Sequence, residues 1–340
     1  MSKTRVAIQG DDFTINGALT YAGTSYGGRQ IEGLLMNSRM VQATFDDLNP
    51  QTRDRFAYPD GPWDPKRNVD EFCASLPLYY EHGLRAVTVN LQGGSPEGYS
   101  TEQPWMNSAY EPNGALRPAY MERLHQILSA ADAIGMVVIV GLFYFGQDER
   151  LEDENAVRAA VINVMNWLVQ GGWSNVLIEI ANEIDVPSYE HEIIQPGRCD
   201  ELILLARERG NGLFPVGTSW GGGSIPSEPI VAVSDIILLH GNHVDDPDRI
   251  RQMVDQTRDL PSYKGQPILF NEDDHCRFEE EENNMLAAAD RHASWGFFDW
   301  RMEGEGFADG YQNPPVDWGI SSPRKRGFFD LLARMTGSVD

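Results

Sequence analysis

Two carboxylic acids stand at the ends of two apolar segments in this sequence. Glu183 closes the segment Val176–Glu183, which begins Val-Leu-Ile and ends in an Asn-Glu pair. Glu272 closes the segment Pro267–Glu272, which ends in a second Asn-Glu pair. Apolar segments rich in β-branched residues are typical of strands buried on both faces. In α/β folds such strands deliver reactive side chains to a cleft at their carboxyl ends, so Glu183 and Glu272 are candidates for catalysis.

A pair of carboxylic acids has the chemistry needed to cleave a glycosidic bond. One acid protonates the leaving oxygen while the other meets the positive charge that develops on the sugar. Retaining enzymes hold the two carboxyl groups ~5–5.5 Å apart, and proximity raises the pKa of one of them. The alternative is that each acid only pairs with an arginine inside the fold. Finding two acids in equivalent positions, each after an asparagine, disfavours that alternative.

A third acid, Glu179, lies four residues before Glu183 and on the same face of an extended strand. It stands in mid-strand, where an unpaired buried carboxylate would be very costly. We therefore predict that Glu179 is structural and ion-paired, with Arg39 or Arg301 as its candidate partner.

The elements that must position these acids alternate regularly along the chain. The pattern predicts an N-terminal hairpin within residues 1–25, then eight strands and about seven helices, with no linker or repeat. The segment 227–234 is too short for a full helix. This order predicts an α/β protein, a single (β/α)₈ TIM barrel over residues 1–340. A doubly wound open sheet is disfavoured because no Gly-x-Gly-x-x-Gly motif follows an early strand. The expected barrel strands are Ile31–Asn37, Ala86–Asn90, Met136–Leu142, Val176–Glu183, Phe214–Thr218, Asp235–His240, Pro267–Asn271 and Ser294–Arg301.

The two acid-bearing segments resemble the fourth and seventh strands of glycoside hydrolase clan A, which includes many cellulases, mannanases and β-galactosidases. The resemblance rests on Asn182-Glu183, with Glu179 before them, and on Glu272 at the end of the seventh strand. It implies a retaining hydrolase of O-glycosidic bonds that has Glu183 as acid/base and Glu272 as nucleophile. The implied substrate is an oligosaccharide or polysaccharide, and no cofactor or metal is expected.

The resemblance also implies roles for residues beside the two acids. Asn182 is expected to hydrogen-bond the sugar 2-hydroxyl, and His240 stands where many clan members have a histidine. Those members usually have an aromatic residue two positions later, often a tyrosine that hydrogen-bonds the nucleophile. Here that position is Asn242, so His240, Asn242 or His243 could take the role instead.

Aromatic and polar residues at other strand ends are candidate sugar contacts. Clan members place an aromatic platform beneath the sugar, and Trp295 and Trp300 of the eighth strand match that position. Only one of the two can face the barrel mouth, and alternation leaves open which. The other predicted contacts are Asn90, Gln92, Tyr144, Gln147, Trp220 and Arg301.

Composition argues against several other classes of function. A net charge of −24 disfavours nucleic acid as a partner, because phosphate binding relies on clustered Lys and Arg. No segment approaches the ~20 apolar residues of a membrane span, and the first residues contain no apolar run of signal-peptide length. The three cysteines form no Cys-x-x-Cys pair, which argues against a disulfide framework or structural zinc. We therefore expect a cytoplasmic protein that binds neither nucleic acid nor membrane; the sequence specifies no oligomeric state.

Two other functions compete with this interpretation. A metal-dependent hydrolase on the same barrel would use Asp273, Asp274, His275 and His240, which offer oxygen and nitrogen ligands. Against it, the first strand has no His-x-His pair and the chain has no His-Glu-x-x-His motif. A catalytically silent carbohydrate-binding barrel would usually have lost one of the two acids, and this chain has both.

Overall fold

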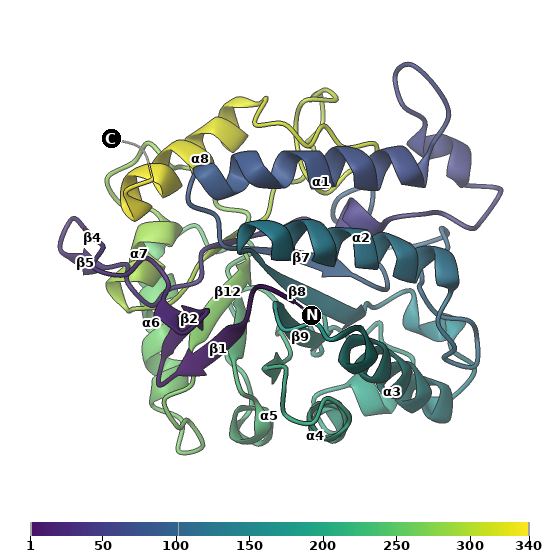
Figure 1. The fold of residues 1–340 in the computed structure, drawn as a ribbon, viewed down its shortest axis with the longest axis horizontal. Helices are drawn as coiled ribbons and strands as arrows, with labels where there is room; N and C mark the ends of the chain where they lie inside the picture. Colours follow the sequence, from purple (N-terminus) through teal and green to yellow (C-terminus); the bar gives the residue numbers. More distant parts are fainter. Residues whose placement is uncertain (1, 101, 339–340) are drawn as a thin grey trace.

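Eight parallel strands close into a barrel in the computed structural model, which describes residues 2–100 and 102–338 (Figure 1). Met1 and residues 339–340, the ends of the predicted domain, lie outside the described residues. Six strands pair in the order β10-β9-β8-β7-β6-β13, and β11 pairs with β12. Backbone hydrogen bonds join the two sheets, from Asp235 N to Val216 O (2.8 Å) and from Phe270 N to Ser294 O (2.9 Å). The predicted (β/α)₈ fold is therefore confirmed. The barrel strands are β6 (Asn37–Arg39), β7 (Ala86–Asn90), β8 (Val137–Phe143), β9 (Val176–Ala181), β10 (Val216–Gly217), β11 (Ile237–His240), β12 (Ile268–Glu272) and β13 (Gly296–Phe297).

Helices follow the strands and cover the outside of the barrel (Figure 1). Capping residues mark the ends of these helices. Asp64 caps α1 by accepting from two backbone N–H groups, and Gly135 ends α2 in a left-handed conformation. The segment 227–234 forms α5, a helix of only 6 residues. No helix within residues 2–100 and 102–338 is long and apolar enough to cross a membrane. The helices are α1 (Pro65–Glu81), α2 (Pro118–Ile134), α3 (Glu154–Gly171), α4 (Cys199–Arg209), α5 (Glu228–Val233), α6 (Pro247–Arg258), α7 (Asn284–Asp290) and α8 (Pro323–Thr336), with short 3₁₀ turns η1 (Val41–Thr44), η2 (Arg53–Phe56), η3 (Asp148–Arg150) and η4 (Glu192–Ile194).

The predicted N-terminal hairpin closes the amino end of the barrel. Strands β1 (Val6–Gln9), β2 (Asp12–Ile15) and β3 (Ala18–Leu19) form an antiparallel sheet, and a second small hairpin joins β4 (Ser25–Tyr26) to β5 (Arg29–Gln30). In Figure 1 the purple β1–β2 pair lies in front of the barrel strands. Val6 and Phe13 are buried there, so apolar side chains fill this end of the barrel. The inward-facing residues that pack with them are Leu35, Ala86, Val137, Ile139, Leu177, Ile236, Leu238 and Leu269.

The first barrel strand begins later than the sequence predicted. The expected segment was Ile31–Asn37, whereas β6 spans Asn37–Arg39. Gly33, which lies between the hairpins and the barrel, adopts a φ of +86°. The apolar residues before Asn37 therefore link the hairpins to the barrel and are not part of the barrel strand. Because side chains alternate along the strand, Arg39 lies on the same face as Asn37 and points into the barrel.

The helix between β12 and β13, α7, is short. It begins at Asn284, after Asn283 caps it by accepting from Leu286 N at 3.0 Å. The preceding residues 279–282 are four consecutive glutamates, whose mutual repulsion disfavours a helical turn.

Candidate active site

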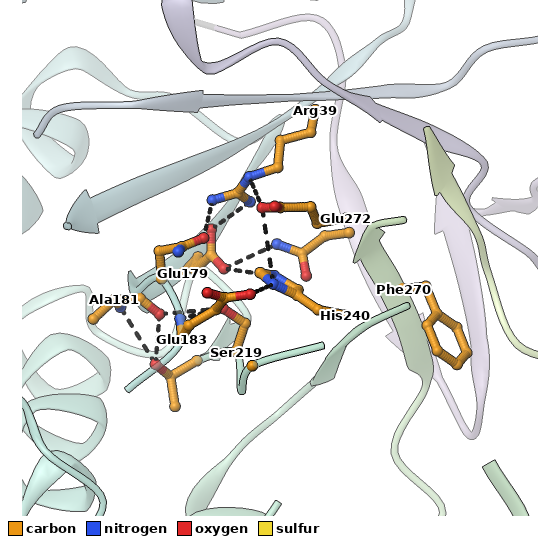
Figure 2. Close-up of polar contacts among 12 residues, drawn as sticks. Arg39, Glu179, Ala181, Glu183, Ser219, His240, Phe270 and Glu272 are labelled. Carbon is orange, nitrogen blue, oxygen red and sulfur yellow. Dashed lines mark hydrogen bonds and ion pairs between the residues drawn. The ribbon is translucent and has the colours of Figure 1, made fainter. Parts of the chain in front are cut away.

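A single buried arginine joins three strands at the carboxyl end of the barrel. Arg39 of β6 places Nη1 3.1 Å from Oε2 of Glu179 on β9, and its Nε contacts Oε2 of Glu272 at the end of β12. Its Nη2 donates to Oδ1 of Asn182. All four side chains are buried, and Figure 2 shows the guanidinium between Glu179 and Glu272. Arg39 therefore fixes the relative positions of β6, β9 and β12 at this end.

Glu179 is held as a structural carboxylate, as predicted from the sequence. Burial raises its pKa, but the charge of Arg39 and the nearby imidazole of His240, with Nε2 3.8 Å from Oε1, lower it more, to about 2. Asn271 Nδ2 also donates to its Oε1 at 2.9 Å. Of the two predicted partners, Arg39 makes the ion pair, whereas Arg301 donates to the backbone carbonyls of residues 313 and 315.

A β-bulge turns Glu272 toward the barrel axis. The register between β11 and β12 shifts after Leu239, so that His240 pairs with Glu272 and Asn271 is left over. Strict alternation would bring either Asn271 or Glu272 to the axis, whereas the extra residue of a bulge lets both face it. Asn271 then bonds Glu179, and Glu272 is directed to Arg39 and Asn242.

Asn242 is the hydrogen-bond partner of Glu272 among the three candidates. Its Nδ2 donates to Glu272 Oε1 at 2.5 Å. His240 bonds Glu183 instead, and His243 is exposed, with its backbone N–H donating to Asp274 Oδ1 at 2.9 Å. The position that the clan usually fills with an aromatic residue therefore contacts Glu272 here through an amide.

Glu183 leaves the end of β9 through a left-handed turn. Its φ is +50°, a conformation that a non-glycine residue adopts at a cost of ~1–2 kcal/mol. The backbone N–H of Glu183 donates to Ser219 Oγ at 2.9 Å, which holds the turn. Because the chain turns after Ala181, Asn182 and Glu183 both reach the cleft, whereas alternation alone had put them on opposite faces.

The carboxyl groups of Glu183 and Glu272 face each other across this site. One oxygen of each and a ring nitrogen of His240 all lie within 4.8 Å of one another. His240 Nδ1 is 2.9 Å from Glu183 Oε1 and 3.8 Å from Glu272 Oε2. Figure 2 shows the imidazole beside both acids. The arrangement is a compact, buried group of two acids and one titratable base.

Charge and burial set the protonation of this group. Burial lowers the pKa of His240, but the charge of Glu272, the nearby carboxylate of Glu179 and the hydrogen bond to Glu183 raise it more, to about 9. Burial raises the pKa of Glu272, against the lowering charges of Arg39 and His240. Burial also opposes ionisation of Glu183, but the hydrogen bond from His240 holds its pKa below the ordinary value. Within this group a proton therefore favours His240 and Glu272 over Glu183.

Three of the predicted sugar contacts lie at the carboxyl ends of strands around the acids. Tyr144, just after β8, has its pKa raised by burial and by the charges of Glu272 and Glu183. Asn90 ends β7, and its buried amide has no hydrogen-bond partner among the described residues. Trp220 follows β10 and is partly buried, with its indole N–H likewise unpaired among them.

Gln92 and Gln147 instead brace the loops above the barrel. Gln92 Nε2 donates to the carbonyl of Gln147 at 2.8 Å, and Gln147 Oε1 accepts from the N–H of Asn107 at 3.0 Å. Both side chains are fully buried. Their polar atoms are therefore used to hold the chain.

The prediction for Trp295 was wrong, because this residue lies away from the mouth. It is fully buried, packs against Phe278 and Phe328 of the outer layer, and donates from Nε1 to Asp273 at 2.8 Å. Trp300 is the tryptophan at the mouth, where its ring contacts Tyr99.

Arg301 holds its own loop. Its Nη2 donates to the carbonyls of residues 313 and 315, the latter at 3.0 Å. The sugar contact of Arg301 stays a prediction.

The alternative metal site is not assembled among the described residues. Asp273, Asp274 and His275 do not form a group of ligand atoms close enough to share an ion. Asp273 is buried and accepts from Trp295 and Asn284, and Asp274 accepts from Tyr99. His240 does belong to a group of three close ligand atoms, but its partners there are Glu183 and Glu272.

Comparisons with known proteins agree with the barrel. No protein-family model matches the chain, and no curated protein matches its sequence. Solved structures similar to it include an endo-1,4-β-mannanase from Rhizomucor miehei, with a TM-score of 0.61, 11% identity and coverage of 98% of this chain and 100% of that one. Another is a broad-specificity endoglucanase of glycoside hydrolase family 5 from Bacteroides salanitronis, with a TM-score of 0.58, 11% identity and coverage of 90% and 94%. A family 5 mannosidase from Rhizomucor miehei gives a TM-score of 0.58 at 12% identity and coverage of 99% and 98%. The chain has the fold of these clan A enzymes.

Removing Glu179 should destabilise the fold. Glu179→Ala leaves the buried Arg39 without its partner, and we expect the free energy of unfolding to fall by ~3–5 kcal/mol in urea denaturation. Glu179→Gln, which can still accept from Arg39, is the matched control and should lose less. A Glu179→Ala protein with wild-type stability and reduced turnover would contradict the structural role.

The stability contributed by His240 should depend on pH. Its pKa rises from 6.5 to about 9 on folding, so its charged form stabilises the fold. This contribution is complete below an unfolded pKa of about 6.5 and disappears as the pH rises through a folded pKa of about 9. The difference in unfolding free energy between the wild type and His240→Asn should therefore shrink by up to ~3 kcal/mol across that range. A difference that stays constant would argue against a charged imidazole.

Proposed function

We propose that the protein is a retaining glycoside hydrolase that cleaves O-glycosidic bonds of an oligosaccharide or polysaccharide. The observation that carries the proposal is the pair Glu183 and Glu272, whose facing oxygens lie within 4.8 Å at the mouth of the barrel. Retaining glycosidases hold their two carboxyl groups ~5–5.5 Å apart, whereas inverting enzymes need ~6.5–9.5 Å to admit a water molecule. The separation favours the retaining reaction.

In the first step Glu272 is the nucleophile and Glu183 the acid. A carboxylate oxygen of Glu272 bonds the anomeric carbon as the bond to the leaving oxygen breaks, and that oxygen takes its proton from Glu183. Arg39 and Asn242 direct positive charge and an N–H group at Glu272, which stabilise it as an anion. In the second step water attacks the anomeric carbon, gives a proton to Glu183 and releases Glu272.

His240 is placed to supply the proton that Glu183 needs. The order of the two pKa values is the reverse of what the first step requires, since Glu183 has the lowered pKa of the pair. Transfer of the Nδ1 proton along the 2.9 Å hydrogen bond would leave Glu183 protonated and His240 neutral. The same nitrogen lies 3.8 Å from Glu272, so it can redistribute a proton within the coupled pair as a sugar binds.

Asn182 has the orientation needed to bind a sugar hydroxyl. Arg39 donates to its Oδ1, which turns the Nδ2 group away from the guanidinium. Among the described residues no hydrogen bond engages that Nδ2 group. We assign it to the 2-hydroxyl of the sugar, where a hydrogen bond can strengthen as the transition state forms.

The carbohydrate substrate is supported by the similar folds and by the groups around the acids. The similar structures carry the names endoglucanase, mannanase and mannosidase. Trp300, Tyr144 and Trp220 supply aromatic surface near the acids, and aromatic faces stack on the C–H side of pyranose rings. A binding barrel without catalysis would not need Glu272, which Arg39 holds, at reactive separation from Glu183.

Variants of the two acids test the division of roles. Glu272→Gly should abolish turnover even for aryl glycosides with good leaving groups, because no covalent glycosyl-enzyme can form. Azide entering the vacated space should then give a glycosyl azide of inverted configuration. Glu183→Ala should spare the first step for activated aryl glycosides, and azide should give a product of retained configuration.

The matched control is Glu81→Ala, which removes an exposed glutamate at the end of α1 and should leave turnover unchanged. Product configuration is measured by NMR. Swapped configurations would mean that the two roles are reversed. Full activity in either acid variant would contradict the proposed mechanism.

A further inference from the structure

The loop that follows β7 carries Tyr99 to residues that follow three other strands, β11, β12 and β13. The hydroxyl of Tyr99 donates to Oδ2 of Asp274, just after β12, at 2.8 Å. Its ring centroid lies 4.6 Å from the imidazole of His243, after β11, and 5.8 Å and 5.4 Å from the rings of Phe298 and Trp300, after β13. Strands β7 and β11 are second and sixth in a ring of eight, so they stand opposite each other. From β7 the loop therefore follows the rim past residues after β6 and β13 and brings Tyr99 to residues after β12 and β11.

Residues 95–99 of this loop are packed against the barrel rim. Gly98 has a φ of +84°, and a Cβ there would lie 2.9 Å from Cε3 of Trp300, so the backbone lies directly on the indole. Nearer β7, the buried Ser95 accepts at its carbonyl from Nε2 of Gln312 at 2.9 Å. Tyr99 is thus held by its backbone, its ring and its hydroxyl.

The two acids define which part of a substrate would meet this segment. Glu183 must stand beside the leaving oxygen, so the leaving group lies on the side of β9, the fourth strand. The sugar attacked by Glu272 extends the other way, toward β13, which is opposite β9 in the ring. Tyr99, Phe298 and Trp300 stand on that second side. The side chains of Glu183 and Glu272 are only 15% and 8% exposed, so both acids are largely shielded from water.

We propose that Tyr99, clasped between Asp274, His243 and Trp300, closes the substrate site one sugar ring beyond the cleaved bond on its non-reducing side. This rests on the proposed function. The enzyme then takes a terminal sugar into a closed pocket and releases single sugars from the non-reducing end of a short chain or small glycoside. A polysaccharide chain cannot lie across the mouth while the clasp is closed.

Matched aryl glycosides test this inference. The probes are the p-nitrophenyl monosaccharide that the wild type cleaves fastest in a panel, and the p-nitrophenyl disaccharide that carries one more copy of that sugar at its non-reducing end. The wild type should release nitrophenol directly from the first probe. From the second it should release a free monosaccharide before any nitrophenol, with no intact disaccharide among the products.

Two variants of Tyr99 distinguish loss of the clasp from a general loss of folding or activity. Tyr99→Ala removes the ring, and we expect intact disaccharide to be released, with kcat/KM for that reaction relative to the monosaccharide probe rising about tenfold or more. Tyr99→Phe keeps the ring and loses only the bond to Asp274, so it should behave nearly as the wild type. Circular dichroism checks that both variants fold.

Direct release of intact disaccharide by the wild type would overturn the inference and leave the proposed function standing. The inference is overturned in the same way if Tyr99→Ala folds and retains the wild-type product pattern. If the wild type cleaves no glycoside in the panel, the proposed function fails, and the inference fails with it.

Discussion

The buried guanidinium of Arg39 is the constraint on which the site depends. It engages Glu179, Asn182 and Glu272, which come from two strands far apart in sequence, and all four side chains are shielded from water. A guanidinium offers five N–H donors in a rigid planar fork, so it fixes direction as well as distance. Burying charges is costly unless each is paired, and a fold that breaks this network would leave an unmatched charge in its interior. The position of Glu272 is thereby tied to the integrity of the barrel.

Apolar and polar side chains occupy opposite ends of the barrel interior. Apolar side chains fill the amino end beneath the hairpin residues Val6 and Phe13, whereas polar groups gather at the carboxyl end. Two local departures from regular strand geometry then aim the acids: the bulge at Asn271 and the left-handed backbone of Glu183. Strained conformations of this kind persist where the surrounding structure determines them, and they cluster at functional sites.

The order of elements could be predicted from the sequence, because helix periodicity, caps and apolar runs are local signals. The pairing of Glu179 could be predicted as well, since a mid-strand carboxylate must have a partner. The bulge that turns Glu272 inward was not predictable, because it depends on pairing with β11. Trp295 was misassigned for the same reason: which face of a short strand meets α8 is decided by packing between distant segments. Tyr99 stood in a long polar loop, and its contact with Asp274 joins residues 175 positions apart.

A nucleophilic Glu272 must form a covalent bond to the sugar, and trapping that bond is the most direct test of the proposed mechanism. An activated 2-deoxy-2-fluoro glycoside slows release of the intermediate, so the protein should gain the mass of one fluorosugar and lose activity in step. Peptide mass spectrometry should place the label on Glu272. A label on Glu183 or elsewhere, or steady hydrolysis of a productive substrate with no labelled protein at any time, would contradict the mechanism.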